Sequence, residues 1–399
     1  MGVVLLCAWA GACGSQAALS QTLDAEKAKP QAPAPPTDTP ALGTLKTVAE
    51  RSDFRATARY EEVQTFLQGL AAASPLVRLT DIGASGEGRT IPMALLADPP
   101  VANAEEAKRS GKIIIAMIGG IHSGECDGKE ALLALARDIA AQRQAAKSDN
   151  DTSDNDTREK GIAATPINAA DLDHAILLFI PIYNPDGNEK MAPANRRGQV
   201  GPETMGEREN AAGLDLNRDF VKLEASETRG LVKMFNQYDP ALFIDTHTTN
   251  GSYHRYILTF DTNKNPAGDS ALLTFSREKM LPRISAAMKK KHGLDTFWYG
   301  NFEQDHSRWE TYPDEPRFGV NYVGMRNRIA ILTESYSYAT YKDRIDAQYK
   351  FVSACIDDAV EHRDEIRKLI READRKSTAA DGDAAEKPPS GLRRRVGVG

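Results

Sequence analysis

Four apolar, strand-like runs of this chain each end in polar residues, and this arrangement constrains the fold more than any other feature. The runs cover residues 112–120, 175–187, 241–247 and 329–334. Segments with helical periodicity lie before, between and after them, at residues 58–73, 129–142 and 346–374. Strands that alternate with helices predict an α/β fold with a largely parallel sheet covered by helices on both faces.

The polar residues that follow these runs are expected to meet at one edge of the sheet. His122 and Glu125 follow the first run, His247 ends the third, and Glu334 ends the fourth. In an open α/β sheet, ligands bind outside the carboxyl ends of the strands, so distant segments can supply a single site. Two histidines and one glutamate are a typical catalytic zinc set, which leaves the fourth position for water.

Each of these residues also has an ordinary structural interpretation. His122 and Glu125 could be a loop histidine and a helix-capping glutamate, because short motifs carry a high false-positive risk. His247 could be a hydrogen-bonded histidine at a sheet edge, and Glu334 could pair with an arginine of segment 326–328. Glu334 could equally be a general base whose pKa is raised toward neutrality by burial.

Further charged residues could complete such a site. Asp215 could receive the second ring proton of a ligating histidine, a contact that fixes the tautomer. Arg218, beside Asn217, could hold a substrate carboxylate, because a guanidinium binds a carboxylate through two parallel hydrogen bonds; a structural surface arginine is the alternative. Arg196 and Arg197 are candidates to polarise a scissile carbonyl.

The order of these motifs resembles the zinc carboxypeptidase family of the carboxypeptidase A type. The matching segments are His122-Ser-Gly-Glu125, Asn184-Pro-Asp-Gly187, Gly213-Leu-Asp-Leu-Asn-Arg218, His247 and Glu334. The resemblance spans most of the chain and implies a three-layer α/β/α sandwich around a mixed, largely parallel sheet of eight strands.

The resemblance also implies catalytic roles. One zinc ion per chain would be held by His122, Glu125 and His247. Glu334 would be the general base and acid that works with a zinc-activated water, and Asp215 would hydrogen-bond His122. The chain would then be a zinc metallocarboxypeptidase that hydrolyses a C-terminal peptide bond.

Substrate-binding roles follow from the same resemblance. The pair Asn217–Arg218 would bind the terminal carboxylate of the substrate. The oxyanion arginine best matches Arg196, with Arg197 as the alternative. The mobile active-site tyrosine matches Tyr312 by spacing, with Tyr322 as the fallback.

Two other functions compete with this interpretation. A zinc deacylase of N-acyl amino acids would keep the same zinc set and also need a carboxylate clamp. A non-catalytic peptide-binding module would be expected to have lost Glu334 or a zinc ligand, and the chain has lost neither. The stretch 198–202 and Asp219 suggest a bacterial branch of the family, whose substrate would be a free peptide or a cell-wall stem peptide.

The two ends of the chain differ in composition from its centre. Residues 1–13 resemble a secretory or lipoprotein-type leader, because a short apolar run ends in Ala10-Gly-Ala-Cys13. A secreted or periplasmic protein is therefore expected, with a lipid anchor through Cys13 as one form. Residues 14–46 are expected to be a disordered Ala/Pro-rich linker, 47–373 the catalytic domain, and 374–399 a disordered tail.

Charge and cysteine content exclude other classes of protein. The net charge is −6, and lysines and arginines are spread along the 399 residues, so no nucleic-acid partner is expected. Four cysteines do not make a disulfide framework in a chain of this length. Cys126 and Cys355 are expected to be buried free thiols.

Overall fold

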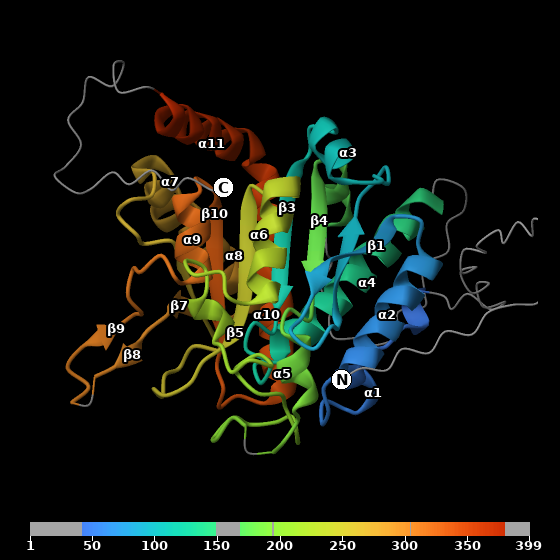
Figure 1. The fold of residues 1–399 in the computed structure, drawn as a ribbon, viewed down its shortest axis with the longest axis vertical. Helices are drawn as coiled ribbons and strands as arrows, with labels where there is room; N and C mark the ends of the chain where they lie inside the picture. Colours follow the sequence, from blue (N-terminus) through green and yellow to red (C-terminus); the bar gives the residue numbers. More distant parts are fainter. Residues whose placement is uncertain (1–41, 149–167, 194, 304, 380–399) are drawn as a thin grey trace, which may run out of the picture. The chain divides into compact units, whose positions relative to one another are not determined.

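A mixed eight-stranded β-sheet forms the centre of the fold (Figure 1). The computed structural model describes residues 42–148, 168–193, 195–303 and 305–379. The order across the sheet is β1-β2-β4-β3-β5-β10-β6-β7, and four of its seven neighbouring pairs are parallel. The strands are β1 (Val77–Ala84), β2 (Thr90–Leu96), β3 (Ile113–Gly119), β4 (Ala175–Ile180), β5 (Leu242–Thr248), β6 (Leu258–Thr262), β7 (Thr296–Trp298) and β10 (Ile329–Ser335). A separate hairpin pairs β8 (Asn301–Phe302) with β9 (Trp309–Glu310).

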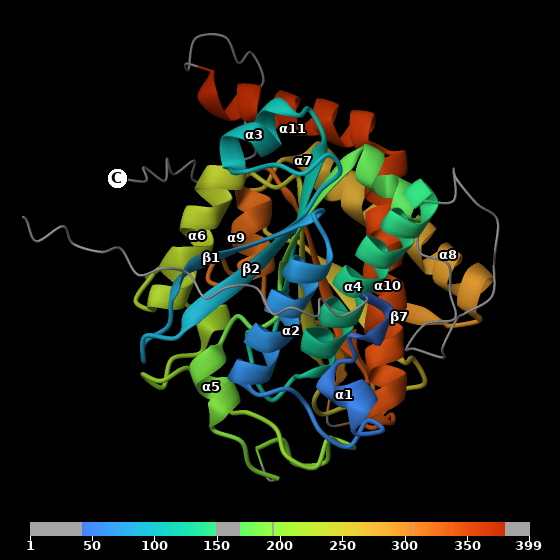
Figure 2. The ribbon, with the colours of Figure 1, turned by 90° about the vertical axis from the view of Figure 1, so that its right-hand side faces the viewer.

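Helices cover both faces of this sheet, so the three-layer α/β/α prediction is confirmed. The larger helices are α2 (Tyr60–Ala73), α4 (Asp127–Ser148), α6 (Ser226–Tyr238), α8 (Leu281–His292), α10 (Tyr341–Glu361) and α11 (Arg363–Thr378). The shorter helices are η1 (Leu42–Thr44), α1 (Val48–Arg51), α3 (Ala104–Arg109), η2 (Ala169–Asp173), α5 (Pro185–Glu189), η3 (Leu216–Arg218), α7 (Ser270–Thr274), η4 (Phe275–Met280) and α9 (Gly319–Met325). Figure 2 shows α6 and α9 on one side of the sheet and α4, α8 and α10 on the other.

The two faces of the sheet form two separate hydrophobic cores. In β3, Ile113, Ile115 and Met117 join the core under α2, α4, α8 and α10. The alternating residues Ile114, Ala116 and Ile118 join the core under α3, α6 and α9. Successive side chains of a strand point to opposite faces, so a central strand that is covered on both sides must be apolar throughout. This requirement explains the continuous apolar runs of the sequence.

The predicted elements agree closely with the observed ones. The runs at 112–120, 241–247 and 329–334 are β3, β5 and β10, and the run at 175–187 is β4 followed by α5. The segment 346–374, predicted to be helical, falls within the pair α10 and α11. Cys126 and Cys355 are buried free thiols, as expected.

The limits of the folded region differ from the predicted ones at both ends. Leu42, expected in the linker, belongs to the hydrophobic core. Helix α11 continues to Thr378, beyond the predicted end at 373, because Ile366, Ile370 and Ala373 bury its apolar face. The leader with Cys13, most of the linker and most of the tail lie outside the described residues. Among the described helices, none combines the length and the apolar character that a membrane span requires.

Candidate metal centre and active site

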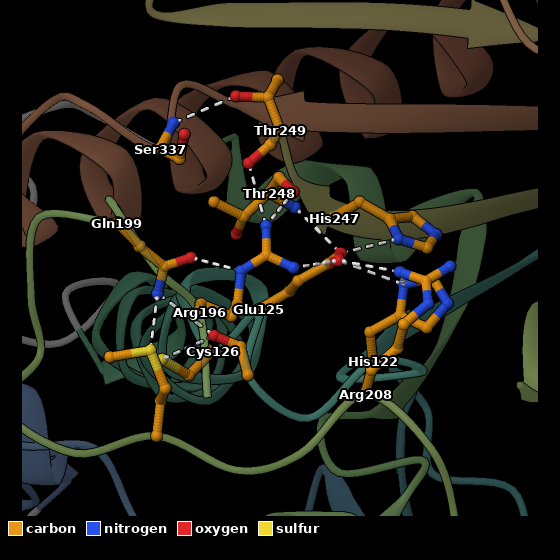
Figure 3. A network of polar contacts seen from close by, with 12 residues as sticks. His122, Glu125, Cys126, Arg196, Gln199, Arg208, His247, Thr248, Thr249 and Ser337 are labelled. Atoms are coloured by element: carbon orange, nitrogen blue, oxygen red, sulfur yellow. Dashed lines mark hydrogen bonds and ion pairs between the residues drawn. The ribbon is translucent and has the colours of Figure 1, made fainter. Parts of the chain in front are cut away.

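Three buried side chains from two distant segments converge on one point. His122 and Glu125 lie between β3 and α4, and His247 lies near the end of β5. One ligand atom from each residue lies within 4.8 Å of the others. His122 Nδ1 is 3.1 Å from Glu125 Oε1, and His247 Nδ1 is 2.8 Å from Glu125 Oε2 (Figure 3). The two histidines therefore direct the same ring nitrogen toward a shared carboxylate.

Close packing between α4 and the sheet brings these segments together. Strands β3 and β5 are parallel neighbours, with Gly119 opposite Thr246. In the first turn of α4, a Cβ atom on Gly128 would lie only 1.9 Å from Thr246 Oγ1. A glycine is therefore needed at this position, and it lets the start of α4 contact β5 directly. The result places Glu125 next to His247, and Glu125 Oε2 also accepts a hydrogen bond from the backbone N–H of Thr248 at 3.1 Å.

The outward-facing nitrogen of each histidine lies next to a second carboxylate. His122 Nε2 is 3.0 Å from Asp215 Oδ1, and His247 Nε2 is 3.0 Å from Asp245 Oδ2. Such carboxylates orient a ligating imidazole and increase its basicity. Asp245 was not predicted from the sequence, although it precedes His247 by two residues on a strand and so shares its face of the sheet.

The charges of the centre lower the pKa values of Glu125 and Asp215. Burial works to raise the pKa of Glu125, but the charges of Arg196 and His122 outweigh it and hold that pKa well below its ordinary value. Burial likewise works to raise the pKa of Asp215, and the hydrogen bond with His122 and the charge of Arg208 lower it. Two imidazoles and an ionised carboxylate in a buried cluster are a donor set that fits a zinc ion.

Glu334 lies beside this centre on β10. It is 7% exposed, and no described residue donates a hydrogen bond to its carboxylate. Burial raises the pKa of Glu334 to about 8, against the opposing charge of His247. The charge of Glu334, together with burial, in turn raises the pKa of Tyr299. A carboxyl group that titrates near neutral pH thus faces the candidate ligands.

Four of the five N–H groups of the Arg196 guanidinium donate to acceptors within the protein. Its Nη1 donates to Glu125 Oε1 at 2.7 Å, and its Nη2 donates to the carbonyls of Thr248 and Thr249 at 2.8 and 2.9 Å. Its Nε donates to Gln199 Oε1 at 2.7 Å. Figure 3 shows this network around the Arg196 guanidinium. Arg196 therefore holds the Glu125 carboxylate in place.

A different arginine, Arg208, extends to the candidate metal ligands with part of its guanidinium. Its Nη2 donates to Asp215 Oδ2 at 2.8 Å, and its Nη1 lies 3.2 Å from His122 Nδ1. Its side chain is 34% exposed, compared with 12% for Arg196. Arg208 was not predicted as a site residue, and its place seven residues before Asp215 was the available signal. Arg197 is exposed.

The predicted carboxylate-binding pair lies on the α9 side of the centre. The Arg218 guanidinium packs over the ring of Phe318 at 4.2 Å, and its Nη1 is 3.9 Å from Asp215 Oδ2. Its side chain is 35% exposed and so accessible to a ligand. Asn217 is buried, and its Oδ1 accepts a hydrogen bond from the backbone N–H of Gly319 at 2.9 Å. Asn217 thus connects the arginine segment to the start of α9.

The tyrosine candidates have different surroundings. The Tyr312 hydroxyl is enclosed and has no hydrogen-bond partner among the described residues. The charge of Glu334 contributes to the raised pKa of Tyr312, after burial and two aspartates. The Tyr322 hydroxyl instead accepts a hydrogen bond from Arg326 at 3.2 Å. Tyr299, which was not predicted, lies beside Tyr312, with ring centroids 6.2 Å apart, and the charge of Glu334 is the largest influence on its raised pKa.

Comparison with known proteins identifies relatives of this fold. The family described as zinc carboxypeptidase has a model that matches residues 63–300. Carboxypeptidase 2 of Trichophyton rubrum is 27% identical over 191 residues, which cover 47% of this chain and 28% of that protein. Human carboxypeptidase D is 28% identical over 177 residues, which cover 44% of this chain and 11% of that protein. The chain therefore matches less than a third of the length of these curated relatives.

Solved structures share the fold at low sequence identity. The metallo-carboxypeptidase from Burkholderia cenocepacia has a TM-score of 0.52 and 15% identity, and the match covers 75% of this chain and 69% of that one. A metallo-carboxypeptidase from Pseudomonas aeruginosa, in complex with (2-guanidinoethylmercapto)succinic acid, has a TM-score of 0.51 and 17% identity, with 77% and 70% covered. These likenesses support the mixed-sheet α/β architecture.

Proposed function

This chain belongs to the zinc carboxypeptidase family, and from that premise we propose that it is a zinc-dependent metallocarboxypeptidase that hydrolyses a C-terminal peptide bond. One observation carries the proposal: the buried cluster of His122, Glu125 and His247 lies beside Glu334, whose pKa is raised to about 8. A single zinc ion, when bound, would act as a Lewis acid and activate water at neutral pH.

Glu334 is proposed to be the general base and acid. A group that transfers protons works best when its pKa is close to the working pH, and burial gives Glu334 such a value. Its carboxylate is also free of hydrogen bonds from the described residues. It can therefore take a proton from the attacking water and pass it to the leaving amine.

We assign the oxyanion role to Arg208 in place of the predicted Arg196. Four of the five N–H donors of Arg196 are occupied by Glu125, two backbone carbonyls and Gln199. Arg208 keeps only its Nη2 and Nε on Asp215, and its Nη1 lies at the metal ligands. A cation placed where negative charge develops stabilises the transition state most effectively.

Arg218 is proposed to bind the terminal carboxylate of the substrate. Its guanidinium is partly exposed and is held in place by Phe318. Burial lowers the pKa of Arg218, yet an arginine remains protonated in proteins. Asn217 supports it through its contact with α9, and Tyr312 is proposed to close over the bound substrate.

Other features remain part of the proposal. The matched curated relatives are fungal and mammalian, so the bacterial branch is proposed on the sequence alone. The same holds for a secreted or periplasmic location, for a lipid anchor through Cys13, and for a cell-wall stem peptide as substrate. Neither the deacylase nor the non-catalytic module gains support from the family match.

The proposed function is tested by release of the terminal residue from matched peptides. The zinc-loaded protein should hydrolyse a peptide with a free C-terminus, and amidation of that terminus should cost about 2–4 kcal/mol in kcat/KM, as expected for the loss of a buried charged contact. His247→Ala should abolish stoichiometric zinc in elemental analysis, whereas His292→Ala, on α8, should retain it. Equal cleavage of free and amidated peptides would contradict an exopeptidase.

A further inference from the structure

A cleft of about 230 Å³ borders the metal ligands and does not include Arg218. Four segments of the chain form it, and its lining is polar and basic. The lining contains three arginines, Arg196, Arg197 and Arg208, and no acidic residue. It therefore favours an anionic ligand.

The three arginines differ in how far their charge is compensated. Arg196 pairs with Glu125 at 2.7 Å, and Arg208 pairs with Asp215 at 2.8 Å. Arg197 is exposed, and no residue in the described ranges forms an ion pair or hydrogen bond with its guanidinium. Arg197 therefore contributes an uncompensated positive charge to the cleft.

The main-chain segment that carries Arg197 is firmly held. Arg344, which is fully buried, donates hydrogen bonds of 2.7 Å to the carbonyls of Val200 and Gly201. Beneath the segment, Gly124 leaves room for Arg196, because a Cβ atom there would lie 2.8 Å from Arg196 Cδ. The floor of the cleft and the base of Arg197 are therefore fixed before any ligand binds, which lowers the entropic cost of binding.

The contacts between charged residues place the cleft relative to the scissile bond. Arg218 Nη1 lies 3.9 Å from Asp215 Oδ2, and the same Asp215 oxygen accepts from Arg208 at 2.8 Å. Arg208 in turn lines the cleft. If the terminal carboxylate lies at Arg218 and the scissile carbonyl at Arg208, the part of the substrate before the scissile bond extends toward the cleft.

We propose that this cleft binds a carboxylate on the residue that precedes the scissile bond, and that Arg197 forms the ion pair with it. This specificity rests on the proposed carboxypeptidase function and extends it from the terminal residue to the penultimate one. The carboxylate can come from two sources that share the same chemistry. One is the side chain of glutamate or aspartate, and the other is the free α-carboxylate of a γ-linked glutamate.

The test compares peptides that differ only at the penultimate residue. Glutamate, glutamine, lysine and γ-linked glutamate are placed before the same terminal residue, and kcat/KM is measured with the zinc-loaded protein. We expect glutamate, in one of its two linkages, to exceed glutamine roughly tenfold, as for a hydrogen bond between charged groups. Whichever linkage is preferred identifies the source of the carboxylate. High salt should reduce the preference, because an accessible ion pair is screened.

Matched variants then identify the residue responsible. Arg197→Gln should bring the glutamate-to-glutamine ratio close to one, and Arg197→Glu should shift the preference to lysine. Lys190→Gln removes one positive charge from the same connection, and its side chain is 40% exposed and lies outside the cleft. This control should keep the wild-type ratio. Zinc content and circular dichroism establish that each variant is folded and loaded.

Peptide affinity gives a second readout that does not need turnover. Calorimetric titration of the same peptides into zinc-loaded Glu334→Gln should show the same order of Kd. Equal kcat/KM for all peptides would overturn the inference and leave the carboxypeptidase proposal standing. The same holds if Arg197→Glu kept the wild-type preference for glutamate over glutamine. Failure to hydrolyse any peptide would overturn the proposed function, and equal Kd values would then overturn the inference as well.

Discussion

Glu334 and His247 are register partners on the adjacent parallel strands β10 and β5, so a buried carboxyl with a raised pKa lies directly beside a candidate metal ligand. The same register places Leu332 opposite Asp245. These two residues precede Glu334 and His247 by two positions and therefore lie on the same face of the sheet. Two rows of side chains result. The outer row carries the proposed chemistry, and in the inner row Asp245 Oδ2 lies 3.0 Å from His247 Nε2.

The first prediction concerns the role of Glu334 in turnover. Glu334→Gln keeps the shape of the side chain but cannot accept a proton, so kcat should fall by about 10²–10⁴-fold or more. Bound zinc should remain stoichiometric, because Glu334 is not one of the proposed ligands. Steady-state kinetics and elemental analysis measure the two quantities. Glu61→Gln, on the surface of α2, is the control, and turnover near the wild-type level in Glu334→Gln would return Glu334 to a structural role.

The second prediction uses the pKa of Glu334 in metal-free protein. Burial raises this pKa from an ordinary 4.5 to about 8, so the folded state binds the proton more tightly than the unfolded state does. The stability that this proton provides is present below about pH 4.5 and is lost as the pH rises toward 8. Glu334→Gln has no such loss. The Tm of metal-free Glu334→Gln should therefore exceed that of metal-free wild type by a margin that grows between pH 5 and pH 8, and parallel Tm profiles would contradict the raised pKa.

Much of the fold could be predicted because the information is local. Ile113 to Ile118 are apolar without interruption since β3 is covered on both faces, and such a run predicts a central strand from composition alone. The candidate zinc ligands have a local signal as well. His122 and Glu125 are three residues apart, and His247 ends a strand, but each also has a structural interpretation. The order of the motifs, which resembles the zinc carboxypeptidase family, selected them, and their role as ligands stays a prediction.

The proposed roles of the arginines and of Asp245 were harder to predict from the sequence, because they depend on how distant segments of the chain are placed in three dimensions. Which arginine of the 190–210 connection reaches the ligands depends on how that connection is held, for example by Arg344 against the carbonyl of Val200, and no periodicity records this contact. Asp245 lies inside an apolar run and is recognisable only once the face of β5 is known. The folded limits were missed at Leu42 because one apolar residue in an Ala/Pro-rich stretch gives little signal.

The third prediction concerns the buried ion pair beneath the site. Arg344 Nε donates to Asp127 Oδ2 at 2.9 Å, and both side chains are fully buried. The same aspartate oxygen accepts from Thr248 and Ser335, at the ends of β5 and β10. Arg344→Met would leave the Asp127 charge without its partner, so the free energy of unfolding should fall by about 3–5 kcal/mol.

Denaturant unfolding of this variant measures the loss. The double variant Arg344→Met with Asp127→Asn removes the uncompensated charge and should recover part of the stability. The exposed ion pair of Arg51 with Glu62 is the matched comparison. Arg51→Met should lower the free energy of unfolding by at most about 1 kcal/mol. Equal effects of Arg344→Met and Arg51→Met would show that the buried pair does not stabilise this end of the sheet.

The last prediction distinguishes the two arginines that contact the centre. Arg208→Ala should lower kcat, with a smaller change in KM, by about 10²–10³-fold, because it removes a donor to charge that develops in the transition state. Its zinc content should persist.

Arg196→Ala should act differently, since Arg196 holds Glu125 through a 2.7 Å contact. Removal of an outer contact to a metal ligand typically costs about 10–100-fold in metal affinity or activity, so Arg196→Ala should bind zinc more weakly, and excess zinc should restore most of its activity. Zinc competition titrations and kinetics at saturating zinc separate the two effects. The oxyanion role would return to Arg196 if Arg196→Ala lost kcat that excess zinc did not restore while Arg208→Ala kept a kcat near the wild-type value.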